Sequence, residues 1–300
     1  MKSVQFSQFG DPEVLEIVDL PDPHPGPGQV RIAVRAAGVN ASDWKKRAGL
    51  MDEGLPQTLG YEASGVVDEV GEDVTDVAVG DRVVGLSEQG GAQAELAVLS
   101  FWAPLPASVG FAEAAALPAA VETAARGLDR LGVVSGSLLL VNGASGNVGS
   151  AAVQLAVARG ARVIGTASRA RHAYVRTLGA EPVAYGETLV KEVRALAPDG
   201  VDRALDVAGS GVLPDLIDLA GSPKHVVTLA DFAGAQEHQV TFSRGDDGRA
   251  LYVLAELGEL IETGRLSLPQ VHTFPLDQVV QAHHLGETGR ADGKIVLINA

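Results

Sequence analysis

The sequence predicts an α/β protein with a strand-rich first part and a second part built on a parallel sheet. Two observations support this prediction. Residues 1–100 read mostly as strands and turns, with few segments typical of helices. From about residue 138, segments typical of strands alternate with segments typical of helices. Such an alternation predicts a doubly wound parallel sheet that is covered by helices on both faces.

The composition limits the classes of protein to which the chain can belong. Its 300 residues are 46% hydrophobic and 4% aromatic, which provides an ample core and is typical of α/β proteins with tight connections. The formal net charge of −15 disfavours nucleic acid and anionic membranes as partners, because both select basic surfaces. The absence of cysteine excludes disulfides, thiol nucleophiles and Cys-ligated metals.

The segments that would direct a protein to a membrane or out of the cell are not recognised in this sequence. The first residues, MKSVQFSQFG, have no apolar core of signal-peptide length. No apolar run approaches the roughly 20 residues that a spanning helix needs. We therefore expect a cytoplasmic protein without a membrane partner.

The first part is expected to contain strands joined by tight turns and one short helix. The proline-rich segment 21–28 predicts a rigid, extended connection. SDWKKRAG, at 42–49, is the strong helical segment of this part. An Ala-rich helical segment then begins near residue 111 and is interrupted at Pro118. Strands are expected within VLEIVDL, QVRIAVRAAGV, EASGVVDEVGEDV and VGDRVVGL.

The second part alternates strands and helices in a regular order. Strands are expected within 138–142, 161–167, 181–185, 201–208 and 224–230, and helices within 147–159, 169–178, 187–196 and 212–220. The change of pattern places a domain boundary near residue 115, and the last segments are expected to return to the first domain. The predicted domains are 1–115 together with 266–300, and 116–265.

A glycine-rich loop follows the first strand of the alternating part. The loop reads GASGNVG, and it joins a strand to an Ala-rich helix. Backbone N–H groups and the helix dipole at such a turn favour a phosphate. The spacing differs from the usual G-x-G-x-x-G, so a turn that holds no ligand is the alternative. The strand–helix–strand context favours a dinucleotide, held by Gly143, Ala144, Ser145, Gly146, Asn147, Val148 and Gly149.

The end of the second strand indicates which dinucleotide is bound. An acidic residue there would accept a hydrogen bond from the free 2′-hydroxyl of NAD. This sequence has Ser168, Arg169 and Arg171 instead. Arginines can hold a 2′-phosphate with paired hydrogen bonds, so NADPH is the predicted cofactor. The alternative is that the two arginines form a solvated helix face.

The chain resembles the medium-chain dehydrogenase/reductase superfamily, and more narrowly its zinc-independent quinone oxidoreductase branch. The resemblance covers nearly the whole chain, because its motifs occur in the family's order and approximate spacing. The motifs are AAGVNASDWKKRAG, LGYEASGVVDEVG, VGDRVVG, AAALPAAVETA, GASGNVGSAAVQLA, LGAE and GKIVLIN. It implies a GroES-like, β-rich catalytic domain followed by a Rossmann domain, with the cofactor in the cleft between them.

The resemblance also implies roles for particular residues. Asn40 and Thr123 would lie near the nicotinamide end of the cofactor, and Leu229 and Ala230 would line the nicotinamide pocket. Ser168, Arg171 and Tyr185 would lie near the 2′-phosphate. The family usually forms homodimers through the edge of the Rossmann sheet, where HQVTF at 238–242 could supply an edge strand. Glu122 departs from the family's pattern, in which an apolar residue is expected.

The zinc sites of related alcohol dehydrogenases cannot be built from this sequence. Asn40 stands at the position of a zinc-binding cysteine, and Tyr61 replaces the histidine of a His-Glu pair. The lobe that binds structural zinc through four cysteines is missing. His283 and His284 point about 100° apart on a helix, so they cannot easily share an ion. No metal site is expected.

Without a Lewis acid, the substrate must already be electrophilic, which favours quinones and α,β-unsaturated carbonyl compounds. Asn40 and Tyr61 are the candidate catalytic donors toward the oxygen on which charge develops. Trp44, Tyr61 and Phe232 are candidates for the substrate-binding wall. Each has a structural alternative, since Asn40 could bond backbone and the aromatic residues could serve packing alone.

Two other functions remain open at this point. The chain could reduce the double bond of an enoyl thioester in a biosynthetic pathway. It could also bind NADPH without turnover and act as a redox sensor. The sequence does not identify the substrate within any of these classes.

Overall fold

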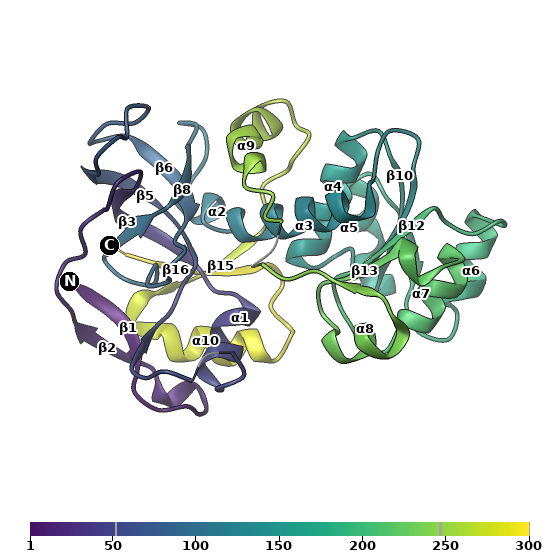
Figure 1. The fold of residues 1–300 in the computed structure, drawn as a ribbon, viewed down its shortest axis with the longest axis horizontal. Helices are drawn as coiled ribbons and strands as arrows, with labels where there is room; N and C mark the ends of the chain where they lie inside the picture. Colours follow the sequence, from purple (N-terminus) through teal and green to yellow (C-terminus); the bar gives the residue numbers. More distant parts are fainter. Residues whose placement is uncertain (52, 246–247, 300) are drawn as a thin grey trace. The chain divides into compact units, whose positions relative to one another are not determined.

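The computed structural model describes residues 1–51, 53–245 and 248–299, and the chain divides into two compact units (Figure 1). The first, which we call the β-rich unit, contains residues 1–119, 254–258 and the segment from residue 268 onward. The second, which we call the Rossmann unit, contains residues 120–253 and 259–267.

The β-rich unit is built on a seven-stranded sheet in the order β15-β16-β3-β5-β6-β8, with β7 also paired to β3. Its strands are β3 (Val30–Gly38), β5 (Glu62–Val70), β6 (Arg82–Leu86), β7 (Leu96–Leu99), β8 (Phe101–Pro104), β15 (Val271–Pro275) and β16 (Lys294–Ile298). Alternate residues Val30, Ile32 and Val34 of β3 are buried, because successive side chains of a strand point to opposite faces. The carboxyl-terminal β16 pairs antiparallel with β3, so the end of the chain belongs to this unit.

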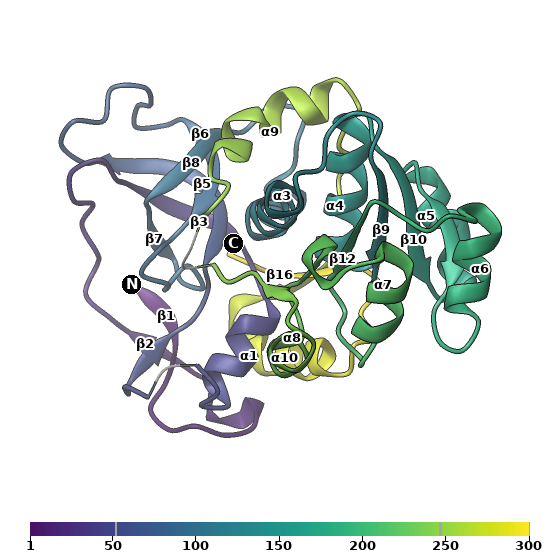
Figure 2. The same ribbon diagram turned by 45° about the vertical axis from the view of Figure 1, so that its right-hand side comes forward.

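A smaller sheet and a pair of helices complete the β-rich unit. The sheet has the order β2-β1-β4, with β1 (Lys2–Phe6), β2 (Glu16–Asp19) and β4 (Gln57–Thr58). The helices α1 (Ala41–Arg47) and α10 (Val279–Glu287) lie side by side, as Figures 1 and 2 both show. They enclose an apolar cluster that includes Phe6, Leu59 and Ile295. Short turns η1 (Pro12–Val14) and η4 (Leu276–Gln278) and the helix α2 (Phe111–Ala114) connect these elements.

The Rossmann unit contains a six-stranded sheet in the order β11-β10-β9-β12-β13-β14, and all its neighbouring strands are parallel. The strands are β9 (Leu138–Asn142), β10 (Arg162–Ala167), β11 (Glu181–Ala184), β12 (Arg203–Asp206), β13 (Val226–Thr228) and β14 (Thr241–Phe242). The order reverses between β9 and β12. In doubly wound sheets, ligands bind beyond the carboxyl ends of the strands at such a switch point.

Helices connect the parallel strands and cover the sheet (Figure 2). The connecting helices are α4 (Asn147–Ala158), α5 (His172–Thr177), α6 (Leu189–Leu196), α7 (Leu213–Ala220) and α8 (Phe232–His238), with turns η2 (Arg169–Arg171) and η3 (Pro223–His225). The helix α3 (Pro118–Leu131) precedes β9, and α9 (Tyr252–Glu262) follows β14, with its residues 254–258 in the β-rich unit. Leu140, Ile164 and Val226 of the sheet form one core with Leu189 and Leu216 of the helices. The predicted fold class, with a β-rich domain and a doubly wound parallel-sheet domain, is therefore confirmed.

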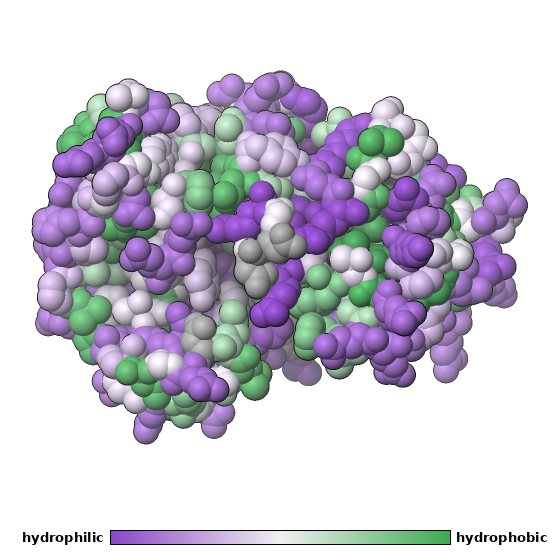
Figure 3. Space-filling model, in the orientation of Figure 1, coloured by the Kyte–Doolittle hydropathy of each residue, from purple (hydrophilic) through white to green (hydrophobic). Residues whose placement is uncertain are grey.

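The surface of both units carries mostly hydrophilic residues between small apolar areas on the face that Figure 3 shows. Among the residues that the structure describes, no helix combines the length and apolar character needed to cross a bilayer.

Candidate functional site

The glycine loop, residues 143–149, joins the end of β9 at Asn142 to the start of α4 at Asn147. Gly143 has a φ of +89°, in the left-handed region that favours glycine. A Cβ at Gly149 would lie 2.0 Å from the carbonyl oxygen of Gly143, so a larger residue does not fit. A Cβ at Gly146 would meet only that same oxygen, at an ordinary 3.5 Å. The fold therefore requires two of the three glycines, whereas its own packing does not explain Gly146.

A buried polar network, missed in the sequence analysis, lies at the carboxyl ends of the Rossmann strands. Asn142 Nδ2 donates to Asp206 Oδ1 at 2.9 Å, and Thr166 Oγ1 donates to Asn142 Oδ1 at 2.7 Å. Thr228 Oγ1 donates to Asp206 Oδ2 at 2.7 Å. All four side chains are buried. The available signal was a polar residue at or next to the last position of four apolar strands.

The carboxylate of Asp206 is the centre of this network. Besides Asn142 and Thr228, the backbone N–H groups of Ala208 and Gly209 donate to its Oδ1, at 3.1 and 2.9 Å. Four donors therefore replace the water that burial removes from this carboxylate. The same bonds fix the loop after β12.

The network also fixes the loops that carry predicted cofactor residues. The N–H of Gly143 donates to Thr166 Oγ1 at 2.9 Å. The N–H groups of Ala230 and Asp231 donate to Thr228 Oγ1 at 3.2 and 3.1 Å. Gly143, at the start of the glycine loop, and Ala230, after β13, are thus held through one set of buried hydrogen bonds at the sheet's carboxyl edge.

The residues predicted for the 2′-phosphate follow two neighbouring parallel strands. Ala167 at the end of β10 is paired with Ala184 at the end of β11. Ser168 and Tyr185 come next in the chain after each of these residues, so both lie at the same edge of the sheet. Tyr185 is 62% exposed, which leaves its ring accessible to a ligand.

The two predicted arginines have different surroundings. Arg169 Nη2 lies 3.0 Å from Glu192 Oε1 and forms an ion pair with it. The guanidinium carbon of Arg171 lies 4.8 Å from the centre of the Tyr174 ring. Glu192, on α6, was not singled out from the sequence, because its approach to Arg169 depends on how α6 follows β11.

Glu122 and Thr123 of α3 belong to a second buried cluster in the Rossmann unit. Glu122 Oε1 lies 3.0 Å from Arg126 Nε, and the side chains are 5% and 4% exposed. Thr123 Oγ1 donates to Glu122 Oε2 at 3.4 Å, and the N–H of Ala250 donates to Glu122 Oε1 at 3.1 Å. Arg126 Nη1 donates to Ser243 Oγ at 2.6 Å. The unexpected glutamate is therefore paired, and it sits beside a predicted cofactor residue.

The residues predicted at the nicotinamide and substrate end follow β13. The N–H of Leu229 donates to the carbonyl oxygen of Asp206 at 2.8 Å, which continues the sheet by one residue. Phe232, at the start of α8, is 51% exposed and packs edge-on against Phe242 with ring centres 5.2 Å apart. Its contact with Phe242 supports a packing role, and its exposed area leaves room for a ligand.

In the β-rich unit, Asn40 belongs to a buried charged cluster. Its Nδ2 donates to Glu62 Oε1 at 2.9 Å, and its Oδ1 accepts a hydrogen bond from Lys294 Nζ. Lys294 Nζ also lies 2.8 Å from Glu62 Oε1, and these two side chains are 5% and 0% exposed. Glu62 Oε2 accepts from the N–H of Ala119 at 2.8 Å. Because Lys294 can only donate, it fixes which way the Asn40 amide faces.

Asp43, on α1, also contacts Asn40, through the backbone of that residue. It accepts hydrogen bonds from the N–H groups of Asn40 and Gly60, at 2.7 and 3.1 Å. Gln93 Nε2 donates to it at 3.3 Å. Burial raises the pKa of Asp43 to about 6, although the backbone donors of Asn40 and Gly60 and the charge of Lys294 act in the opposite direction.

Tyr61 follows Gly60, whose φ of +95° places it in the left-handed region. A Cβ at Gly60 would lie 2.5 Å from the backbone nitrogen of Gln93, so the turn before Tyr61 requires glycine. The Lys46 ammonium lies 5.6 Å from the centre of the Tyr61 ring. The ring is half-buried, which is compatible with the predicted donor role and with packing.

Trp44 packs between α1 and α10. Its ring meets His283 edge-on, with centres 6.3 Å apart, and a Cβ at Gly286 would lie 2.7 Å from Trp44 Cζ3. It also belongs to the apolar cluster of α1 and α10. These contacts support the packing alternative for Trp44, and its substrate contact stays a prediction.

The adjacent histidines have different partners. His283 is fully buried, and its Nδ1 accepts from Arg47 Nη1 at 3.1 Å. Burial lowers the pKa of His283 to about 3, so its ring is neutral at physiological pH. His284 Nε2 lies 2.7 Å from Glu13 Oε1. Among the residues that the structure describes, no three His, Asp or Glu side chains come together as a metal site would require.

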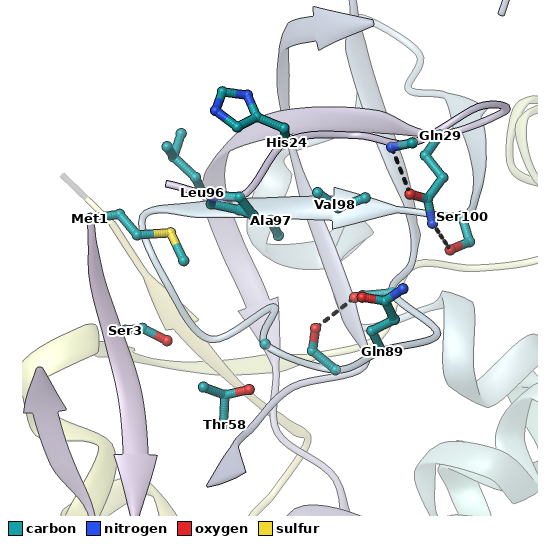
Figure 4. Close-up of a pocket in the computed structure, with 15 residues that line it drawn as sticks. Met1, Ser3, His24, Gln29, Thr58, Gln89, Leu96, Ala97, Val98 and Ser100 are labelled. Carbon is teal, nitrogen blue, oxygen red and sulfur yellow. Dashed lines mark hydrogen bonds between the residues drawn. The ribbon is translucent and has the colours of Figure 1, made fainter. Parts of the chain in front are cut away.

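A pocket of about 460 Å³ lies elsewhere in the β-rich unit, between β1, β7 and the loop that follows β6 (Figure 4). Gln29 Nε2 donates to Ser100 Oγ at 3.0 Å along its wall. None of the predicted site residues lines this pocket.

Two family models match this chain, and the second match includes segments of both units. Residues 26–125 match the alcohol dehydrogenase GroES-like domain, and residues 178–297 match the zinc-binding dehydrogenase domain. The chain is 34% identical to 2-methylene-furan-3-one reductase of Solanum lycopersicum, over 99% of this chain and 79% of that protein. The chain belongs to the medium-chain dehydrogenase/reductase superfamily. The resemblance identified from the sequence motifs is thus confirmed.

Solved structures of the superfamily agree. The quinone oxidoreductase from Coxiella burnetii matches with a TM-score of 0.84 and 33% identity, over 100% of this chain and 99% of that chain. The Escherichia coli quinone oxidoreductase, solved in complex with NADPH, matches with a TM-score of 0.84 and 26% identity over the whole of both chains. These neighbours place the chain among nicotinamide-dependent oxidoreductases of the superfamily.

One relative is much longer than this chain. The spectinabilin polyketide synthase protein NorB of Streptomyces orinoci is 38% identical over 90% of this chain, which spans only 13% of that protein. The present chain is therefore similar both to separate reductases and to a short part of a much longer polyketide synthase protein.

The second matching domain is described as zinc-binding. The residues at the zinc-ligand positions, Asn40, Tyr61 and Glu62, do not fit a zinc ion. Both oxygens of Glu62 and the Oδ1 of Asn40 already accept hydrogen bonds from protein donors. Lys294 places an ammonium beside both residues, where a metal ion would be repelled. A phenol such as Tyr61 and an amide are also weak zinc ligands compared with thiolate and imidazole.

Proposed function

We propose that the chain is an NADPH-dependent oxidoreductase that reduces quinones or α,β-unsaturated carbonyl compounds without a metal. When bound, NADPH supplies a hydride, which an electrophilic carbon of the substrate accepts. The family, the glycine loop and the donor set around Asn40 support this proposal.

The observation that carries the cofactor part of the proposal is the small size of Gly146. Gly143 and Gly149 are explained by φ and by backbone contact, but no neighbour requires glycine at 146. A pyrophosphate that approaches the loop would require it, because a methyl group would stand between the phosphate and the N–H groups. The first N–H groups of α4 have no partner within the helix, and they are the proposed donors.

The 2′-phosphate part of the proposal is supported by the residues after β10 and β11. Ser168, Arg169 and Arg171 offer hydroxyl and guanidinium donors, and Tyr185 offers an exposed ring. Guanidinium groups match a phosphate with paired hydrogen bonds. We propose that these residues favour NADPH over NADH.

Asn40 is the proposed donor to the substrate oxygen. One hydrogen of its amide nitrogen is used for Glu62, and the second remains for a ligand. Lys294 holds the carbonyl end of the amide, so the nitrogen cannot turn away. A fixed N–H donor stabilises charge that develops on oxygen and costs no reorganisation at that moment. Tyr61 is the proposed second donor, Thr123 and Leu229 are proposed to flank the nicotinamide, and solvent is proposed to supply the proton.

The test is to follow NADPH absorbance with a panel of quinones, enones, enals and enoyl thioesters, with NADH in parallel. Rapid oxidation of NADPH with a quinone or enone supports the proposal. Quenching of NADPH fluorescence without oxidation by any acceptor would instead indicate a binding protein or sensor. Failure to bind either coenzyme would contradict the proposal altogether.

A second candidate is the reduction of enoyl thioesters. The 38% identity to NorB, a polyketide synthase protein, favours keeping this class in the panel. A thioester polarises its double bond as a ketone does, so the same donors at Asn40 and Tyr61 would serve. A kcat/KM for an enoyl thioester far above that for any free enone or quinone would favour this candidate.

We further propose that the chain forms a homodimer through β14. This strand is at the edge of the Rossmann sheet, and among the described residues it pairs with β13 alone. An uncovered edge can pair with a second copy of itself. Sedimentation at micromolar concentration tests this: a mass of twice the 30.9 kDa chain is expected, and the monomer mass would contradict it.

A further inference from the structure

Glu192 places a carboxylate beside an arginine that the proposed function assigns to the 2′-phosphate. Its Oε1 lies 3.0 Å from Arg169 Nη2 and accepts from Thr188 Oγ1, also at 3.0 Å. Its Oε2 accepts from the N–H of Ala184 at 2.8 Å. The Glu192 side chain is 27% exposed, whereas that of Arg169 is 73% exposed.

These contacts hold the carboxylate in one place. Ala184 ends β11, and Thr188 immediately precedes α6, so Glu192 is anchored by its own helix start and by the neighbouring strand. The backbone N–H of Ala184 holds the pKa of Glu192 below its ordinary value. Arg169 is the more exposed member of the pair.

An ionised carboxylate here opposes a bound 2′-phosphate in two ways. It neutralises the guanidinium of Arg169, so the phosphate must compete for it. It also repels the phosphate directly, because like charges at short range disfavour each other. A coenzyme with a free 2′-hydroxyl would meet neither cost, and a carboxylate can accept a hydrogen bond from that hydroxyl.

We propose that Glu192 is a specificity-determining residue that lowers the preference for NADPH over NADH. This inference rests on the proposed function, which places the 2′-phosphate beside Arg169. Arg169 and Arg171 favour the phosphate, and Glu192 offsets part of their effect. The discrimination between the two coenzymes is therefore smaller than the two arginines alone would give.

The chain offers a matched control for this residue. Arg162 and Glu181 also form an arginine–glutamate ion pair, with Nε and Oε1 2.7 Å apart, between β10 and β11. They are the first residues of those strands, whereas Arg169 follows the carboxyl end of β10 in η2, and Glu192 lies on α6 after β11. Glu181→Gln removes a carboxylate from a pair that the coenzyme does not approach.

The experiment is a fluorescence titration of the full chain, Glu192→Gln and Glu181→Gln with NADPH and with NADH. Glutamine keeps an oxygen for the N–H of Ala184, and thermal unfolding checks that each variant is folded. Glu192→Gln is expected to tighten NADPH binding by roughly three- to fivefold, the size expected from a partly exposed charge pair, without tightening NADH. Glu181→Gln is expected to leave the ratio of the two dissociation constants unchanged.

A second variant gives an independent reading. If Glu192 offsets Arg169, Arg169→Ala weakens NADPH binding more in the Glu192→Gln background than in the natural sequence. An unchanged or smaller NADPH preference in Glu192→Gln, while the natural chain binds NADPH, would overturn this inference and leave the proposed function standing. If the natural chain binds neither coenzyme, the proposed function fails as well.

Discussion

The two units fix their proposed functional groups with different chemistry. In the β-rich unit, Lys294 and Glu62 form a buried ion pair that orients the side-chain amide of Asn40. In the Rossmann unit, the carboxylate of Asp206 is surrounded by neutral donors, and the network positions backbone groups at the ends of the strands. A charge pair orients one side chain, while a network of neutral donors holds several loops at once.

This difference predicts how much stability each unit loses when one residue of its ion pair or of its hydrogen-bond network is replaced. Loss of one partner from a buried ion pair leaves an uncompensated charge, which is costly. Loss of one member of a neutral network leaves an unsatisfied donor or acceptor, which costs less. Substitutions in each unit therefore distinguish the two ways of fixing a functional group.

The largest effect is expected from Lys294→Met. It leaves Glu62 buried without its cation and is expected to lower the free energy of unfolding by about 3–5 kcal/mol. Glu62→Gln in the same chain is expected to recover much of this loss, because it removes the unpaired charge. Urea unfolding of the single and double variants measures both. Equal stability of Lys294→Met and the natural chain would show that the pair is not needed.

The β-rich unit is also expected to carry two opposing pH effects. The pKa of Asp43 is raised from 3.8 to about 6, so the folded chain binds its proton more tightly. The protonated Asp43 therefore stabilises the folded state at low pH, and about 3 kcal/mol of unfolding free energy is lost as the pH rises from about 4 to about 6. The pKa of His283 is lowered from 6.5 to about 3, so stability is lost as pH falls through that range.

The contributions of Asp43 and His283 are separated by measuring the unfolding midpoints of the natural chain and of one variant of each residue at about pH 4.5 and at about pH 7. Asp43→Asn is expected to make stability rise more steeply with pH than in the natural chain. His283→Gln is expected to make it rise less steeply, or fall. Parallel pH profiles for both variants and the natural chain would contradict the assigned shifts.

A smaller effect is expected from Asp206→Asn in the Rossmann unit. Asparagine keeps one oxygen for the backbone donors but turns an amide nitrogen toward Thr228 or Asn142. The expected loss of stability is about 1–3 kcal/mol, because at least one buried donor faces another donor. Binding of NADPH is expected to weaken as the loops lose their fixed positions. A loss as large as that of Lys294→Met would remove the contrast between the two units.

The smallest effect is expected from Tyr61→Phe. The change removes one hydroxyl from a half-buried ring and keeps its packing, so stability is expected to change little. Turnover with enones is expected to fall more than turnover with quinones, since a quinone needs less stabilisation of its oxygen. Equal and negligible effects on both substrate classes would remove Tyr61 from the proposed mechanism.

The fold could largely be predicted from the sequence because its signals are local. The strand at 138–142 and the start of the helix at 147 agree with β9 and α4, since an apolar run and three glycines mark both boundaries. The interruption at Pro118 agrees with the start of α3. HQVTF does contain the edge strand, although β14 is only two residues long.

The parts that could not be predicted are partnerships between distant residues. Lys294 reaches Asn40 across 254 positions, because β16 returns to pair with β3. Asp206 reaches Asn142 across 64 positions, because β12 lies beside β9. Glu122 departs from the family's pattern in the sequence, and only the fold shows that Arg126 and the N–H of Ala250 are its partners.

Binding of a pyrophosphate to the glycine loop is tested most directly by titrating Gly146→Ala with NADPH and measuring the thermal unfolding of the same variant. The added Cβ meets only one backbone oxygen at an ordinary 3.5 Å, so the melting temperature is expected to stay near that of the natural chain. NADPH affinity is expected to fall by about tenfold or more, which corresponds to about 1.4 kcal/mol or more of binding free energy. Unchanged NADPH affinity in the folded variant would contradict the claim.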